Sequence, residues 1–184
     1  EGVNVVVAGA EENTFDGTIT VNGDARYDGA ETLKFEGINF KSNAKKDFIS
    51  APTKYDGRYN YSHNVTVDGC TFSSEAYNEE IVGIKLQTTY KAVIMNCKAE
   101  NIHSLAQISS TDNEIVIENV EVVNCKNGLG LGNIAKAVIN GAKINAKGYG
   151  IRLDGEKTRT VAATIEDSEI KAYIPVNIRR MNNE

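Results

Sequence analysis

A short pattern of apolar and polar positions recurs along the chain. It consists of two alternating apolar runs separated by a single Gly, Asn or Asp. Because side chains alternate between the two faces of a strand, each run places its apolar residues on one side. The residue between the runs is of a type that accepts the left-handed backbone of a sharp bend. Six copies begin at Leu33, Val65, Ala92, Ile115, Ala137 and Ala163, and their bend residues are Gly37, Gly69, Asn96, Asn119, Gly141 and Asp167.

A third short apolar run follows each copy at a nearly constant distance. These runs begin at Phe48, Gly83, Ala106, Leu129, Gly150 and Val176. Val5 and Val7, with Ile19 and Val21, fit a looser first copy. Three short strands per repeat and repeats of similar length predict an all-β solenoid, a right-handed parallel β-helix of about seven coils. The hexapeptide period of a left-handed β-helix and the spacing of leucine-rich repeats are both absent from the sequence.

The order of strand, one-residue bend, strand, turn and strand resembles the pectate-lyase-like superfamily of parallel β-helices, over nearly the whole chain. The resemblance implies an architecture and not an activity, since that superfamily includes lyases, hydrolases, esterases, tailspikes and non-enzymatic surface proteins. It also implies that a ligand would lie on the face formed by the third strands. By analogy with such proteins, we expect an extracellular or cell-surface location.

The side chains that point outward from the third strands form two rows. The first row holds Thr20, Ser50, Lys85, Gln107, Gly130, Arg152 and Asn177, and the second holds Asn22, Gln87, Ser109, Gly132, Asp154 and Arg179. We expect a shallow polar groove with a glycine floor, in which Lys85, Arg152 and Arg179 could attract an anionic sugar. The alternative is an ordinary solvated strand face.

The two rows contain too few acids for catalysis. Glycoside hydrolysis uses two carboxylates that face each other across the substrate, and only Asp154 lies in these rows. A lyase of the superfamily would add a calcium ion held by clustered acids, and no such cluster is evident. We therefore predict no catalytic residue and no cofactor, with calcium reserved for the lyase alternative.

Five tyrosines fall in the turns that lead from a third strand to the next repeat. An aromatic ring with a polar tip suits stacking on a sugar or contact with a protein partner. The alternative is that these rings cover the turns and shield the strand ends. The five residues are Tyr27, Tyr55, Tyr59, Tyr61 and Tyr90.

The cysteines and histidines do not predict a metal site. Cys70 and Cys97 occupy the same position in consecutive repeats, so we expect two stacked, buried thiols, with a disulfide as the alternative. Cys125 has no equivalent partner. His63 and His103 stand at no zinc-like spacing from another ligand, and we expect them to pack in loops.

Composition removes two classes of partner. The formal net charge of −5 disfavours nucleic acid, and no apolar run is long enough to span a membrane. The absence of evident capping segments suggests that residues 1–184 are one β-helix domain, a module of a larger protein, whose open ends could also support oligomers. Three functions remain: a non-catalytic module that binds a glycan or a surface protein, a lyase-like enzyme on acidic glycans, and a purely structural or phage-tail-like solenoid.

Overall fold

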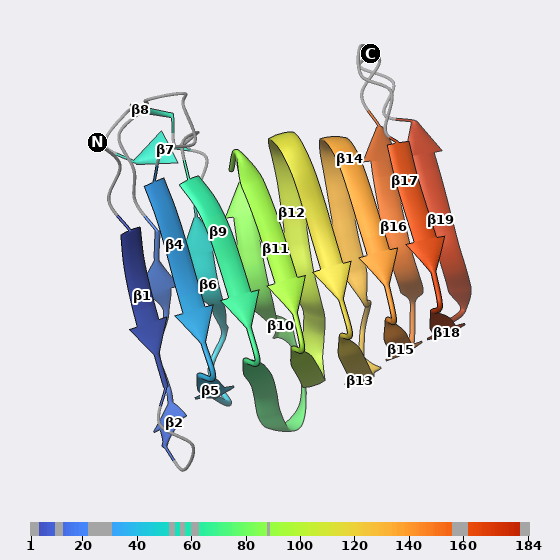
Figure 1. The fold of residues 1–184 in the computed structure, drawn as a ribbon. Coiled ribbons are helices and arrows are strands. Elements are labelled where there is room, and N and C mark those ends of the chain that lie inside the picture. Colours follow the sequence, from blue (N-terminus) through green and yellow to red (C-terminus); the bar gives the residue numbers. More distant parts are fainter. Residues whose placement is uncertain are drawn as a thin grey trace.

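A computed structural model describes residues 4–9, 13–21, 31–51, 54–55, 58–59, 63–87, 89–155 and 162–180. The described chain forms one sheet that winds around a single core, and every strand pair within that sheet is parallel. The coils follow one another in sequence order along the rod (Figure 1). The chain is thus a right-handed parallel β-helix of the pectate-lyase-like architecture, as the repeat pattern predicted.

The first face of the rod contains the first strand of each repeat. Neighbouring strands are in register, with Leu33 beside Val65 and Ile117 beside Ile139. The face consists of β1 (Asn4–Ala8), β4 (Glu31–Glu36), β9 (His63–Asp68), β11 (Lys91–Met95), the end of β12 (Lys98–Glu118), the end of β14 (Leu129–Asn140) and β17 (Ala162–Glu166). Its seven rungs confirm the predicted number of coils.

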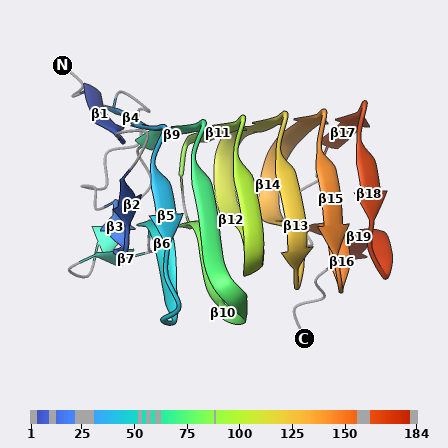
Figure 2. The same ribbon diagram turned by 90° about the horizontal axis from the view of Figure 1, so that it is seen from below.

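The second face follows the one-residue bend and lies along the lower side of Figure 1, which Figure 2 shows directly. It consists of β2 (Thr14–Phe15), β5 (Asn39–Lys41), the start of β10 (Thr71–Gln87), the start of β12, β13 (Glu121–Cys125), β15 (Lys143–Ala146) and β18 (Glu169–Lys171). All six predicted bend residues have positive φ angles, between 46° and 67°. The pattern therefore located the bends correctly.

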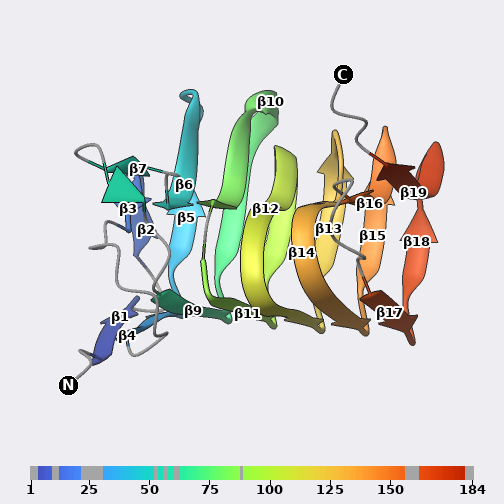
Figure 3. The ribbon, with the colours of Figure 1, turned by 90° about the horizontal axis from the view of Figure 1, so that it is seen from above.

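The third face closes each coil, and its strands follow the same order when the rod is seen from above (Figure 3). It consists of β3 (Ile19–Thr20), β6 (Lys46–Ala51), the end of β10, the middle of β12, the start of β14, β16 (Tyr149–Gly155) and β19 (Ile174–Arg180). A small antiparallel hairpin, β7 (Lys54–Tyr55) and β8 (Arg58–Tyr59), stands apart from the wound sheet.

Three strands are longer than the sequence pattern predicts. β10, β12 and β14 have 17, 21 and 12 residues and continue around corners where we expected turns. At some of these corners the backbone stays extended apart from one residue in the left-handed region, as at Asn101 and Asn133 with φ angles of 60° and 49°. A single left-handed residue changes the chain direction without ending the ladder of hydrogen bonds.

The core is a set of columns in which equivalent residues of successive coils stack. One column consists of aromatic rings, Phe15, Phe40 and Phe72, with centroid distances of 5.5 Å and 5.1 Å between neighbours. The column after the bend contains Ile38, Cys70, Cys97, Val120 and Ala142, all buried. The predicted inward positions thus form the core, and the outward positions of the third face remain available for a ligand.

Candidate functional site

The two outward rows predicted on the third face are present. Hydrogen-bonded register places Gln107 beside Gly130 and Gly130 beside Arg152. In the next row, Gly132 is beside Asp154, and Asp154 is beside Arg179. These side chains share one face because they occupy alternate positions on adjacent parallel strands.

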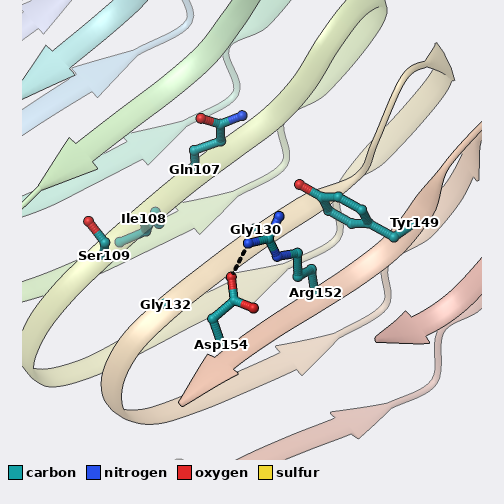
Figure 4. A pocket seen from close by; sticks show the side chains of 8 residues that line it. All are labelled: Gln107, Ile108, Ser109, Gly130, Gly132, Tyr149, Arg152 and Asp154. Carbon is teal, nitrogen blue, oxygen red and sulfur yellow. Dashed lines mark ion pairs between the residues drawn. The ribbon is translucent and has the colours of Figure 1, made fainter. Parts of the chain in front are cut away.

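A pocket of about 210 Å³ lies across the middle of these rows. Its floor is Gly130 and Gly132 of β14, where a Cβ would meet no heavy atom closer than 3.4 Å. The missing side chains therefore leave a shallow space between β12 and β16. We call it the third-face groove; it is lined by Gln107, Ile108, Ser109, Gly130, Gly132, Tyr149, Arg152 and Asp154 (Figure 4).

One carboxylate and two guanidinium groups give the groove its charge. Asp154 Oδ2 lies 2.6 Å from Arg152 Nη2, and Asp154 Oδ1 lies 3.3 Å from Arg179 Nε. The Asp154 side chain is only 14% exposed, so its charge is compensated within the protein. The hydrogen bond to Asp154 raises the pKa of Arg152 above its ordinary value. Arg152 Nε is buried without a hydrogen-bond partner among the described residues, so part of its donor capacity is unused.

Tyr149 forms the end wall of the groove and was not among the predicted site residues. Its ring lies 5.7 Å from the Arg152 guanidinium carbon, and its hydroxyl reaches over Gly130 (Figure 4). Burial raises the pKa of the Tyr149 hydroxyl. The buried Asn127 positions the backbone here, because Asn127 Oδ1 accepts a hydrogen bond of 3.1 Å from Tyr149 N.

The strict alternation of inward and outward side chains does not predict that Tyr149 faces outward. Counting back from Arg152 by twos reaches Gly150, and Tyr149 would then point inward. The alternation breaks at this point, because Gly150 and Ile151 are both buried whereas Tyr149 is only half-buried. The register with β19 stays constant, with Tyr149 beside Ile174 and Ile151 beside Val176. Gly150 has its own reason to be glycine, since a Cβ there would clash with Ile170 and with Pro175 O. The sequence feature that could have pointed to Tyr149 as a site residue is its position between Gly148 and Gly150 at the start of a strand.

The other predicted cations do not line the groove. Lys85 Nζ pairs with Asp47 Oδ2 at 3.1 Å, on the β6 side of the face. Arg179 stands at the rim with its side chain 48% exposed and reaches the groove through Asp154. Gln107, Arg152 and Asp154 are thus the predicted residues that the structure brings together.

The predicted tyrosine edge stays a prediction. Tyr27 and Tyr61 lie outside the described residues. Tyr55 and Tyr59 belong to the β7–β8 hairpin, where the backbone alone is described. Tyr90 is half-buried beside the start of β11.

The groove does not contain the paired acids of a glycosidase. Asp154 is the sole carboxylate among the described residues that line it, whereas that reaction uses two carboxylates about 5 to 10 Å apart. Among the described residues, no three His, Cys, Asp or Glu side chains form a group that could hold a metal ion. A calcium-dependent lyase site therefore finds no support here. The described part of the chain also lacks any helix long and apolar enough to cross a membrane.

His103 has a structural role. Its Nδ1 lies 3.0 Å from Glu79 O, and its Nε2 lies 3.2 Å from Asn127 Nδ2. The ring joins the corner of β10 to the coil that positions Tyr149, so the expected packing role is confirmed, but His103 lies within strand β12 and not in a loop. His63 begins β9, and its side chain is outside the described part of the structure.

Cys70 and Cys97 point into the core on adjacent coils, as predicted. They are free thiols, 0% and 2% exposed. Each lies near the carbonyl two residues earlier, with Cys70 Sγ 3.5 Å from Asp68 O and Cys97 Sγ 3.1 Å from Met95 O. The neighbouring Cys97 thiol lowers the pKa of Cys70, and the Cys70 thiol together with burial raises the pKa of Cys97.

Comparison with known proteins gives one family. The model described as "NosD: Periplasmic copper-binding protein (NosD)" matches residues 11–180. No curated protein and no solved structure matches significantly. The family description names a binding protein and no enzyme, which agrees with the lack of paired acids in the groove.

Proposed function

Because the chain belongs to the NosD family, we propose that it is a non-catalytic binding module that works outside the cytoplasm, in the periplasm. Its third-face groove binds a polar ligand. The observation that carries this proposal is the glycine floor between Gln107 and Arg152, walled by Tyr149 and Asp154. Glycines that expose the backbone of two neighbouring positions allow a flat ligand to approach closely.

The groups around the groove suit an oligosaccharide with acidic substituents. Asp154 and Gln107 can accept hydrogen bonds from sugar hydroxyls, and Tyr149 offers a ring for stacking. Arg152 and Arg179 together outweigh the single negative charge of Asp154. A planar guanidinium is the best side chain for binding a carboxylate with two hydrogen bonds.

A glycan array followed by calorimetry tests this assignment. Gly132→Phe places a ring on the groove floor at an outward position, so binding should disappear while the fold is retained. Arg152→Gln should weaken acidic glycans more than neutral ones, because it removes the charge. Asn145→Phe is the matched control, since Asn145 is an exposed outward residue on β15 of the second face.

Glycan binding that survives Gly132→Phe would place the ligand elsewhere, with the tyrosine edge as the next candidate. The absence of any glycan binding would refute the carbohydrate assignment. Capture of a surface protein that Gly132→Phe abolishes, with no glycan bound, would assign the groove to a protein partner instead.

Copper binding is a second candidate function. It is favoured by the family description together with the adjacent positions of Cys70 and Cys97, two free buried thiols on neighbouring coils. Thiolates are soft ligands that select Cu(I), whereas Cu(II) prefers nitrogen and oxygen donors in a tetragonal array. The residues therefore fit cuprous copper in donor type. They do not fit cupric copper, because no described cluster of three or more His, Cys, Asp or Glu is present.

The copper function is tested by anaerobic titration of the purified chain with Cu(I) against a chromogenic chelator. Transfer of one equivalent from the chelator to the protein is the expected result. A chain that takes no Cu(I) from the chelator would refute copper binding and leave the groove proposal intact.

A further inference from the structure

Cys70 and Cys97 are the two thiol-bearing residues of their core column, and they occupy adjacent coils. They stand next to each other, since Lys98 N donates to Cys70 O at 3.0 Å and so joins the two coils at this point. Both are free thiols, 0% and 2% exposed, on neighbouring rungs of the column. The neighbours before and after them in the column, Ile38 and Val120, are buried and apolar. The pair is therefore an isolated two-sulfur site inside an apolar wall.

We propose that Cys70 and Cys97 together bind one cuprous ion between the third and fourth coils of the rod. This rests on the copper-binding candidate above and names its ligands. On binding, two S–H bonds break, two S–Cu bonds form and two protons leave to solvent, with no change in the oxidation state of sulfur or copper.

The donor set selects among metals. Zinc in structural sites takes four ligands, and calcium takes six to eight oxygens. The pair offers two sulfurs, and the nearest additional polar atoms are the backbone carbonyls of Asp68 and Met95, which are hard donors. A soft monovalent ion that accepts two thiolates matches this environment.

A surface hollow lies outside the wall that holds the pair. It has a volume of about 600 Å³ and is lined by residues adjacent in sequence to both thiols, including Gly69, Thr71 and Lys98. A Cβ at Gly69 would meet no heavy atom closer than 3.9 Å, and one at Gly37 would meet none within 4 Å. The two bends thus leave the backbone beside Cys70 uncovered on the outer face of the wall.

The same column supplies a conservative substitution. Ser168 occupies the equivalent position in the last described coil, and its hydroxyl donates to Glu166 O at 2.7 Å. A serine in place of Cys70 or Cys97 can make the same bond to the carbonyl two residues earlier. Cys70→Ser and Cys97→Ser should therefore fold, and they remove one sulfur each. Cys125→Ser is the matched control, because Cys125 is equally buried and donates to Val123 O at 3.4 Å in the same manner.

The experiment is anaerobic Cu(I) titration of the whole chain and these variants, followed by ultraviolet thiolate-to-copper absorption and by X-ray absorption at copper. The wild type and Cys125→Ser should bind one Cu(I) with two sulfur neighbours. Each of the other variants should bind roughly a hundredfold more weakly or not at all, since half of the donor set is lost. Thiol counting in denaturant first establishes that all three cysteines are reduced.

Three results would overturn the inference. Copper that still binds with sulfur ligation in a Cys70→Ser/Cys97→Ser double variant would refute this site and leave copper binding standing. A wild type that binds no Cu(I) would refute both. The third result is a Cys70–Cys97 disulfide in protein isolated under non-reducing conditions from an oxidising compartment. It would show that the pair is a structural cross-link and not a metal site.

Discussion

The bend residues are the positions where one side chain matters most to the backbone. Asn119 has a φ of 51°, a region that costs most residues roughly 1–2 kcal/mol. Asn119→Ala should therefore lower the free energy of unfolding by about 1–2 kcal/mol. Asn119→Gly should stay within about 1 kcal/mol of the wild type, because glycine adopts positive φ without strain.

Urea denaturation of the two variants measures this difference. Equal losses in Asn119→Ala and Asn119→Gly would mean that the amide contacts of Asn119, and not its backbone conformation, stabilise the bend.

Cys125 gives a pH dependence at the residue scale. Burial raises the pKa of its thiol from 9.0 to about 11. The folded protein thus keeps this proton to higher pH than the unfolded chain. The contribution to stability is complete below pH 9.0 and is lost as pH rises towards about 11, by up to about 3 kcal/mol.

Denaturation curves of the wild type and Cys125→Ala across this pH range isolate the effect. Lysines and tyrosines titrate in both proteins, so the difference between the two curves reports on Cys125. We expect the wild type to lose stability more steeply above pH 9.0. Parallel curves would mean that the thiol ionises equally easily in both states.

At the scale of a strand, the phenylalanine column stabilises the first coils. Phe72 of β10 is fully buried and stacks on Phe40 of β5 with an interplanar angle of 10°. Phe72→Ala should cost about 3–5 kcal/mol, because it leaves a cavity between two coils. Thr66→Ala, on the outward side of neighbouring β9, should change stability by less than about 0.5 kcal/mol. Thermal unfolding followed by circular dichroism compares the two variants. Similar melting temperatures would mean that the Phe column contributes little to stability.

The strand scale also explains what the sequence could and could not predict. Alternation and bend chemistry are local, so the first two faces and the left-handed Asn119 follow from a few neighbouring residues. The long strands β10 and β12 depend on whether a corner breaks the ladder, which is decided by the adjacent coils. Tyr149 enters the groove because the alternation breaks at the buried Gly150 and Ile151, and the close approach of Ile170 and Pro175 to Gly150 is again a contact between coils. The pairing of Lys85 with Asp47 is likewise a contact between coils.

At the scale of the whole molecule, the rod is a linear stack in which strands pair with those of adjacent coils. The corner of β10 reaches further, from Glu79 to Lys126 and from Tyr77 to Lys147. Stability of such a stack is close to a sum of coil terms and interface terms. The column that contains Ile94, Ile117, Ile139 and Ile165 tests this directly, because the same residue type recurs in successive coils. Ile117 is fully buried, whereas Ile165 in the last described coil is half-buried.

The same substitution should therefore have different costs along one column. Ile117→Ala removes a side chain that is covered on both sides and should lower the free energy of unfolding by about 2–5 kcal/mol. Ile165→Ala removes one that is covered mainly by Ile139 and should cost less than half as much, since the loss scales with buried apolar area. Urea denaturation of the isolated chain measures both values. Equal costs would mean that the coil of Ile165 is covered on its far side as well, by chain segments or by a second copy, and that the rod in solution continues beyond it.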